Sequence, residues 1–407
     1  MTPVQKDERA AKQPTKKATR TKSTRPKKSV PLSAVERMKR RETRRQERRA
    51  YAAAAPAVGA AATEEVQSQL QSLSWKLERL QQAASLSDIY DDLADIDAML
   101  STLPAEIEAL RARGYVFRNY LERKVEVLSQ QWTEMQDRVR REVERRSAEL
   151  SQALREAERA VQNAASGNPA QIARAESAVR TLEGKVSAAQ DALEAMFDTL
   201  DRNVTQTRAQ VEAIEWALEQ ADQASFDFYP DENLVAACRA QFLETKKDGP
   251  EGILFLTDGR LIFERKEEVA TKKILFITTE KKTVQELVFQ VPIGHVEEVK
   301  ASQSGFLGRK EMLEIRFAPE ADISEARLRL LGGADNEEWA ALIGRVRSGD
   351  IEKERVRTEE EEPARAEPVA PAEVPTKCPN CGAILTTPIV KGMREITCEY
   401  CGTVIRL

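Results

Sequence analysis

The sequence predicts a multidomain chain of the α plus β class. We expect long antiparallel coiled-coil helices first, then a seven-stranded β-barrel or sandwich with a C-terminal helix, and finally a small four-cysteine module. Three observations predict this order. Apolar residues recur at 3-4 spacing within residues 63–226, short β-rich runs fill residues 230–349, and two Cys-x-x-Cys pairs lie within residues 376–407. A chain of 407 residues has room for two or three domains.

Residues 1–62 are expected to form a basic tail. Residues 1–50 contain 18 Lys and Arg against 5 Asp and Glu, so the rest of the chain carries a net charge of −17. Composition predicts disorder up to about residue 32, and Ser33 with Glu36 has the spacing of a capping box that opens a basic helix. The charge is compatible with a solvated tail, with nucleic acid bound through its phosphates, or with an anionic membrane or acidic partner.

Residues 63–226 are expected to form a helical coiled-coil rod or bundle. The most regular stretch repeats an apolar residue every seventh position, at Ile172, Val179, Val186, Leu193 and Leu200. Sustained heptads with charged flanks favour a coiled coil. This pattern predicts association into a homo-oligomer, with an intrachain three-helix bundle as the alternative.

Two breaks interrupt the helical pattern, at Ser101–Pro104 and at Gly167–Pro169. The second is a strong turn signal and should fold the flanking helices into an antiparallel hairpin. Positions whose numbers sum to about 335 would then face each other, which places Trp216 beside Phe117 and Tyr120 as an aromatic contact.

Residues 230–349 switch to a β pattern. The Asp258–Gly259 pair predicts a hairpin turn, and a helix starting near Asp335 would present Trp339 and Ile343 on one face. The seven expected strands are Leu234–Phe242, Gly252–Thr257, Arg260–Glu264, Ile274–Thr279, Glu286–Ile293, Met312–Phe317 and Ala326–Leu331.

The run from Gly252 to Phe263, Gly-Ile-Leu-Phe-Leu-Thr-Asp-Gly-Arg-Leu-Ile-Phe, resembles the hallmark of GRAM-type and bacterial pleckstrin-homology (PH)-like domains. The resemblance covers about 120 residues and implies the PH superfold, with a face for lipid or protein. Phosphoinositide binding in that family depends on basic residues in the second strand. Here Ile253–Leu256 contains none, so the sequence departs from the family pattern.

Two groups of residues in this domain are candidate contacts for anionic lipid or a protein partner. Lys246, Lys247, Lys272 and Lys273 would make a diffuse cationic rim. Phe306 and Leu307 form an apolar loop tip that either inserts into a partner or bilayer, or packs under its own loop.

An acidic, proline-bearing linker is expected over residues 350–375, and it should let the following module swing independently. That module contains Cys378, Cys381, Cys398 and Cys401 in two Cys-x-x-Cys pairs, the spacing of a four-cysteine zinc site. Iron fits the same ligands, and disulfides are disfavoured because nothing marks the chain for export.

The segment resembles a zinc ribbon, with its Cys-Pro-x-Cys-Gly knuckle. Four thiolates complete a tetrahedron and leave no position for a catalytic water, so we expect Zn²⁺ in a structural role. A segment of about 30 residues cannot bury enough core to fold without such help.

The predicted function is that of a non-enzymatic cytoplasmic scaffold or adaptor with a protein partner. His295 has no catalytic partner, Cys238 fits a buried inert thiol, and no constellation supports an enzyme or a small-molecule substrate. A nucleic-acid-associated factor acting through residues 1–50 and the ribbon is the first alternative. A peripheral membrane adaptor is the second, because no stretch of 18 apolar residues predicts a span.

Overall fold

The computed structural model describes residues 33–53, 62–244, 248–274, 277–304, 310–356, 375–386, 389, 393, 395–398 and 400–407, without the side chains of residues 47–53, 62–63 and 268–282. All of these residues belong to one compact unit, Leu32–Leu407. Among them, no helix has the length and apolar character needed to cross a membrane.

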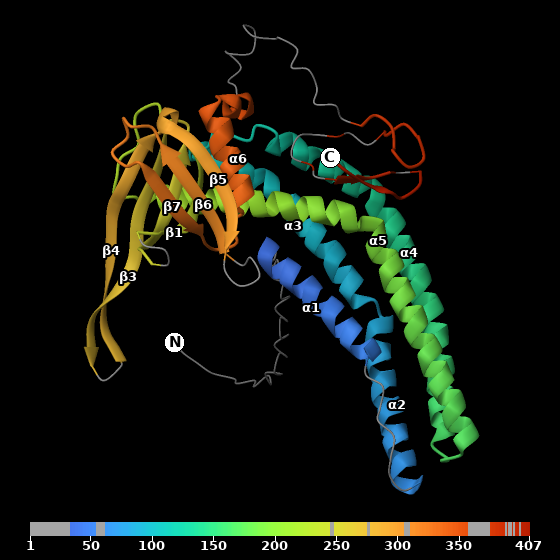
Figure 1. Cartoon of the computed structure of the whole chain (residues 1–407). Coiled ribbons are helices and arrows are strands. Elements are labelled where there is room, and N and C mark those ends of the chain that lie inside the picture. The colour runs from blue at the N-terminus through green and yellow to red at the C-terminus, as the bar shows by residue number, and fades with distance from the viewer. Residues whose placement is uncertain are drawn as a thin grey trace, which may run out of the picture. The chain divides into compact units, whose positions relative to one another are not determined.

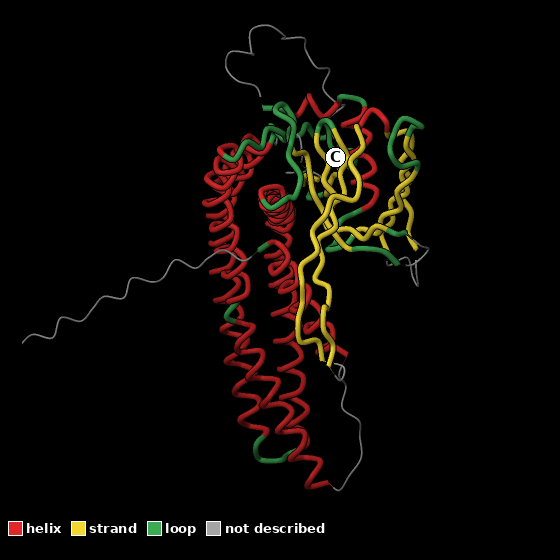
Figure 2. Tube along the Cα trace, turned by 90° about the vertical axis from the view of Figure 1, so that its left-hand side faces the viewer, coloured by secondary structure: helices red, strands yellow, loops and turns green. Residues whose placement is uncertain are grey.

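Five helices occupy the first half of the described chain. They are α1 (Ala34–Ala53), α2 (Ala62–Ala84), α3 (Ser87–Ala112), α4 (Leu121–Ala164) and α5 (Pro169–Asp222). The two longest, α4 and α5, lie side by side in an antiparallel hairpin, and α2 and α3 both pack against this pair (Figures 1 and 2). These helices therefore pack on one another within one copy of the chain, and association between copies stays a prediction.

The turn between α4 and α5 falls where the sequence predicted it. Gly167 has a φ of +74°, a conformation that side chains disfavour, and the Asn168 side chain accepts a hydrogen bond from Ala170 N at 2.9 Å. Pro169 follows at the first helical position, where its missing N–H costs nothing.

The predicted break at Ser101–Pro104 is wrong, because α3 runs through it with Pro104 inside the helix. Leu100, Leu103 and Ile107 are all buried, so packing on both sides of the proline holds the helix together. The chain turns instead at Leu86, which is fully buried and has a φ of +55°.

The second half of the chain forms one seven-stranded antiparallel sheet. Its strands are β1 (Leu234–Phe242), β2 (Glu251–Thr257), β3 (Arg260–Ile274), β4 (Ile277–Pro292), β5 (Val296–Ser304), β6 (Lys310–Phe317) and β7 (Glu325–Leu330). They lie in the order β4-β3-β2-β1-β7-β6-β5. Beyond Arg265, β3 pairs with β4 alone, and this hairpin extends past the other strands (Figure 1).

Two details of the predicted strands need correction. Two of the predicted strands are in fact parts of the single strand β4, which contains residues 277–279 and 286–292; Ile274 ends β3 and Ile293 begins the short 3-10 helix η1 (Ile293–His295). Strand β5 was not predicted at all. Strand β5 is polar over most of its length because it forms an edge of the sheet and is largely exposed.

Helix α6 (Asn336–Arg347) follows the sheet and packs on β5 and β6. The Asp335 side chain caps it by accepting a hydrogen bond from Glu338 N at 2.8 Å, and Trp339, Ile343 and Val346 are buried beneath it. A seven-stranded antiparallel sheet with this following helix is the PH-like architecture that the sequence predicted.

The first residues of the predicted linker are packed. Asp350–Glu354 forms a short 3-10 helix, η3, with Ile351 buried, and Asn119 N donates a hydrogen bond to Glu354 O at 2.9 Å. Residues 357–374 of the predicted linker lie outside the described residues.

The predicted aromatic contact at the far end of the hairpin is also wrong. No ring contact in the described part of the chain joins Trp216 to Phe117 or Tyr120. Phe117 instead meets Tyr115 edge-on at 6.3 Å, and the Arg355 guanidinium lies 4.9 Å from the centre of its ring.

Candidate metal centre

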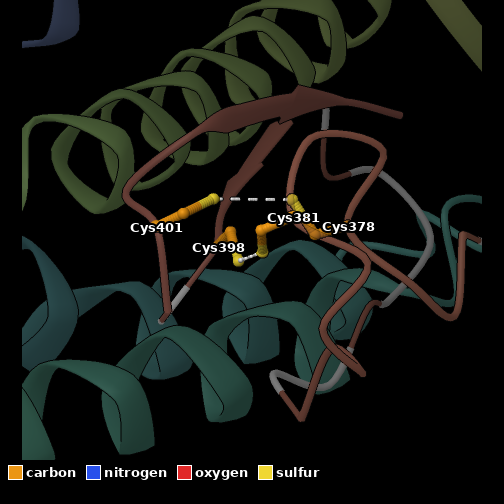
Figure 3. Close-up of side chains that lie close together, drawn as sticks. All are labelled: Cys378, Cys381, Cys398 and Cys401. Carbon is orange, nitrogen blue, oxygen red and sulfur yellow. Dashed lines mark hydrogen bonds between the residues drawn. The ribbon is translucent and has the colours of Figure 1, made fainter.

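The four C-terminal cysteines come together at one point, as Figure 3 shows. Their sulfur atoms all lie within 4.8 Å of one another. The Cys378–Cys401 and Cys381–Cys398 sulfur pairs are each 3.7 Å apart, too far for a disulfide bond. The structure thus places the ligands predicted from two distant Cys-x-x-Cys pairs in one cluster.

The two halves of the cluster have the same local geometry. Gly382 N donates to Cys378 O, and Gly402 N donates to Cys398 O, both at 2.9 Å. Both glycines adopt positive φ, +72° and +70°, which completes a tight turn after each cysteine pair. A short β-ribbon of β8 (Glu395–Thr397) and β9 (Val404–Arg406) holds the second turn.

The residues fit a tetrahedral metal ion. Zinc–sulfur bonds of about 2.3 Å in a tetrahedron put neighbouring sulfurs about 3.8 Å apart, close to the separations found here. Cys378 and Cys398 are buried while Cys381 and Cys401 are exposed. Hydrogen bonds with Thr403 lower the pKa of Cys401 to about 6. A backbone hydrogen bond with Ala383 acts to lower the pKa of Cys381, but hydrogen bonds with the neighbouring thiols outweigh it and raise this pKa to about 12.

The described part of the module contacts the middle of α5. Arg202 pairs with Glu395, Asn203 Nδ2 donates to Glu395 O at 3.0 Å, and Thr397 Oγ1 donates to Thr199 Oγ1 at 2.7 Å. No sequence pattern predicts this contact, because the partners are nearly 200 positions apart and none of them is apolar.

A buried ion pair explains the Thr-Asp-Gly-Arg turn of the PH-like domain. Arg260 donates from both Nε and Nη2 to the Glu232 carboxylate, at 2.8 and 2.5 Å, and both side chains are at most 5% exposed. Thr257 Oγ1 and Tyr229 N donate to the same carboxylate. Burial pushes the pKa of Glu232 up, but these hydrogen bonds outweigh it and hold the pKa below its usual value.

Glu232 was not among the predicted residues, because it lies 28 positions before Arg260 and no local pattern connects the two. An open cavity of about 520 Å³ borders this pair and is also lined by Asp231, Asp258 and Asp322. Because Glu232 already neutralises Arg260, the cavity presents no free arginine to an anionic ligand.

The predicted lipid or partner contacts are not brought together by the described residues. Lys246, Lys247, Phe306 and Leu307 lie outside them, and Lys272 and Lys273 lie on β3 where side chains are not described. These contacts therefore stay predictions. Cys238 is buried on β1, and burial raises the pKa of its thiol far above its usual value, in keeping with an inert side chain.

The fold and the site together define a class: a helical region, then a PH-like domain, then a cluster of four cysteines whose geometry fits a metal ion. No family model matches the chain, and no curated protein matches it.

Among solved structures, the chain is similar to the N-terminal PH domain of Vps36, with 17% identity over 31% of this chain and 86% of that one. It is also similar to the linker-DH/PH domains of p115-RhoGEF, with 12% identity over 71% and 98%. A third similarity is to the DH/PH fragment of PDZRHOGEF in complex with human RhoA, with 12% identity over 70% and 91%. Each has a TM-score of 0.21, too low to carry an argument about function.

Proposed function

We propose that this chain is a non-enzymatic cytoplasmic scaffold, in which a helical frame carries a PH-like binding domain of GRAM type and a structural zinc ribbon. The observation that carries the proposal is the shared use of α5. Near its C-terminal end, α5 meets the β domain through Gln220, which accepts a hydrogen bond from Lys266 Nζ at 3.1 Å. Near its middle, the same helix meets the ribbon through Arg202 and Asn203.

The chemistry of the cysteine cluster supports a structural role for the bound ion and not a catalytic one. Four sulfur ligands satisfy a zinc ion completely, so the ion's effect is to fix the two turns of the ribbon. The Glu232–Arg260 pair likewise holds two turns together, because each group neutralises the other. These arrangements present surfaces to protein partners and stabilise the elements that bear them.

The proposal is tested by affinity purification of the full-length chain beside two variants. One variant is Cys378→Ser with Cys398→Ser, which removes two metal ligands. The other is Arg327→Glu with Arg329→Glu, two half-buried side chains of β7 that line a cavity of about 260 Å³. A scaffold with two contact surfaces should lose different partners in the two variants and keep the rest. Identical partners in all three preparations would contradict the proposal.

Binding of nucleic acid is the second candidate function. It is favoured by the arginines of α1, of which four lie along one side of the helix within the described residues: Arg37, Arg40, Arg41 and Arg44. A probe shift that weakens steeply with added salt is the expected result. No shift of single-stranded or duplex DNA at low salt would remove this candidate.

A further inference from the structure

We propose that the arginine face of α1 is a binding site for nucleic-acid phosphates, and that an aspartate trough of the same chain covers it as a built-in competitor. The arginine face consists of Arg37, Arg40, Arg41 and Arg44. The aspartate trough consists of Asp88, Asp91, Asp92 and Asp95 on α3 together with Asp198 and Asp201 on α5. The inference rests on the second candidate function, and adds to it the site and the means by which the site is closed.

The two rows of charges have matching periods. Arginines occupy positions 37, 40, 41 and 44, and aspartates of α3 occupy positions 88, 91, 92 and 95, so both rows repeat with steps of three and four residues. In helices this spacing puts all members of a row on one side. Arg37, Arg40 and Arg44 accordingly pair with aspartates of α3, whereas Arg41 pairs with aspartates of α5.

Ion pairs join the two rows along their whole length. Arg44 lies 2.9 Å from Asp92, and Arg40 lies 2.5 Å from Asp91. Further contacts join Arg37 to Asp95 and Asp201, Arg40 to Asp95, Arg41 to Asp198 and Asp201, and Arg44 to Asp88, and Asp198 also pairs with the exposed Arg45. Asp92 and Asp201 are covered most completely, since each side chain is only 2% exposed.

Helix α1 is held against α3 and α5 by ion pairs and by almost no apolar packing. Among its described side chains, only Ala34 and Arg37 are buried, while Val35 and Met38 are more than half exposed. The other long helices bury continuous apolar stripes instead. Salt weakens exposed ion pairs such as Arg40–Asp91 and weakens buried pairs much less, but a competing polyanion can take the place of the carboxylates in both. Helix α1 is thus the element best suited to leave its place.

The aspartates do not accept hydrogen bonds from all the guanidinium N–H groups of the arginine face. The Nε atoms of Arg37 and Arg44 are buried and have no hydrogen-bond partner in the described part of the chain. A buried donor without a partner costs free energy that a better ligand would recover. Phosphates bind guanidinium groups in the same two-pronged way as carboxylates and offer more oxygens, so a nucleic-acid backbone fits these donors.

The composition of α1 favours nucleic acid over a lipid surface. A helix that lies on a bilayer needs a broad apolar face. Over positions 34–46 the apolar residues are Ala34, Val35 and Met38, all in the first turns, and the remainder are polar or charged. A row of arginines without an apolar face therefore matches the phosphates of a nucleic acid better than the surface of a bilayer.

The test uses the full chain and a fluorescent 20-nucleotide single-stranded DNA at low salt. The variant Asp92→Asn with Asp201→Asn should bind the probe about 10-fold more tightly, because apparent affinity scales with the fraction of molecules in the open state. The matched control is Glu134→Gln with Asp137→Asn, which removes the same charge from exposed positions of α4. Equal affinities of the two variants would overturn the inference.

Two further measurements distinguish covering of the arginine face by the trough from nucleic-acid binding as such. Replacing Arg37 and Arg41 by Gln in the opened variant should abolish the gain, and binding that persists would place the site in residues 1–32 instead. In the wild-type chain, saturating probe should raise the carbodiimide labelling of Asp92 and Asp201. If the probe binds and the labelling of Asp92 and Asp201 does not rise, the aspartate trough is not a competitor, although the chain still binds nucleic acid. No binding by any variant would remove both.

Discussion

Asp198 links two arginines that come from different parts of the chain. Its Oδ1 accepts a hydrogen bond from Arg41 of α1 at 3.1 Å, and its Oδ2 pairs with Arg202, one turn further along α5. Arg202 in turn pairs with Glu395 in the cysteine module. One turn of α5 thus holds both the N-terminal helix and the C-terminal ribbon by charge.

Replacing Cys378 or Cys398 by Ser should release bound metal and unfold the ribbon, while the helices and the sheet stay folded. Three ligands bind zinc far more weakly than four, and the ribbon has little core of its own. Elemental analysis of protein purified under reductant should fall from about one zinc per chain to near zero. Cys238→Ser serves as the control, and stoichiometric zinc retained by the ligand variants would contradict the assignment.

Cys238 should resist alkylation in the native protein. Its thiol is buried in β1 and its pKa is raised well above the usual value, so almost no thiolate exists at neutral pH. After chelation of the metal, mass spectrometry should find iodoacetamide on the four clustered cysteines and none on Cys238 until denaturant is added. Rapid native modification of Cys238 would show that β1 opens readily.

Glu232→Gln should destabilise the β2–β3 hairpin at neutral pH by roughly 3 kcal/mol, because it leaves the buried guanidinium of Arg260 without its counter-charge. The folded-state pKa of Glu232 lies below its ordinary value of 4.5. The stabilisation is therefore fully present above the unfolded-state pKa and is lost as pH falls through the folded-state pKa.

Amide exchange of residues 253–263, followed from pH 7 downward, measures this effect. The difference between wild type and variant should shrink in acid. Asp231→Asn, one residue earlier and exposed, is the matched control and should change little. A difference that stays constant down to low pH would count against the carboxylate of Glu232 as the cause.

Asn168→Ala should cost about 1 kcal/mol of stability in the α4–α5 hairpin, because the helix loses the side chain that caps Ala170 N. Gly167→Ala should cost a similar amount through its positive φ. Denaturant midpoints of the two variants check the prediction, with Ser166→Ala at the neighbouring exposed position as the control.

Arg202→Ala should loosen the ribbon from α5 without freeing α1, because Asp198 keeps its contact with Arg41. Carbodiimide labelling of Glu395 should rise several-fold, while labelling of Asp201 stays low. Arg138→Ala on the exposed side of α4 is the control. Equal rises at Glu395 and Asp201 would show that the two attachments are lost together.

Local signals predicted much of this fold. The Ser33–Glu36 capping box forms as expected, with Glu36 N donating to Ser33 Oγ at 3.3 Å and Ser33 N donating back to Glu36. The turn at Gly167–Pro169 and the capped start of α6 also depend on residues next to one another in sequence. Such features are predictable because their physical causes lie within a few positions.

Features that depend on long-range packing were missed. The sequence predicted that a helix ends at Pro104, but the packing of buried neighbours keeps α3 helical on both sides of this proline. Edge strand β5 shows no apolar alternation because one side of its ladder faces solvent. For the site, cysteine spacing predicted all four clustered ligands. The pairings of Glu232 with Arg260 and of the α1 arginines with the trough join distant positions that no local pattern connects.

The unbroken length of α5 has a geometric consequence. A helix of 54 residues turns by about 100° per residue, so Asp198 and Gln220 keep a fixed angular relation around one axis. Inserting a single alanine between them would rotate the surface that holds α1 and the ribbon by roughly a quarter of a circle relative to the β domain. The relative rotation of residues around the axis of α5 therefore determines whether α1, the ribbon and the β domain can contact this helix at the same time.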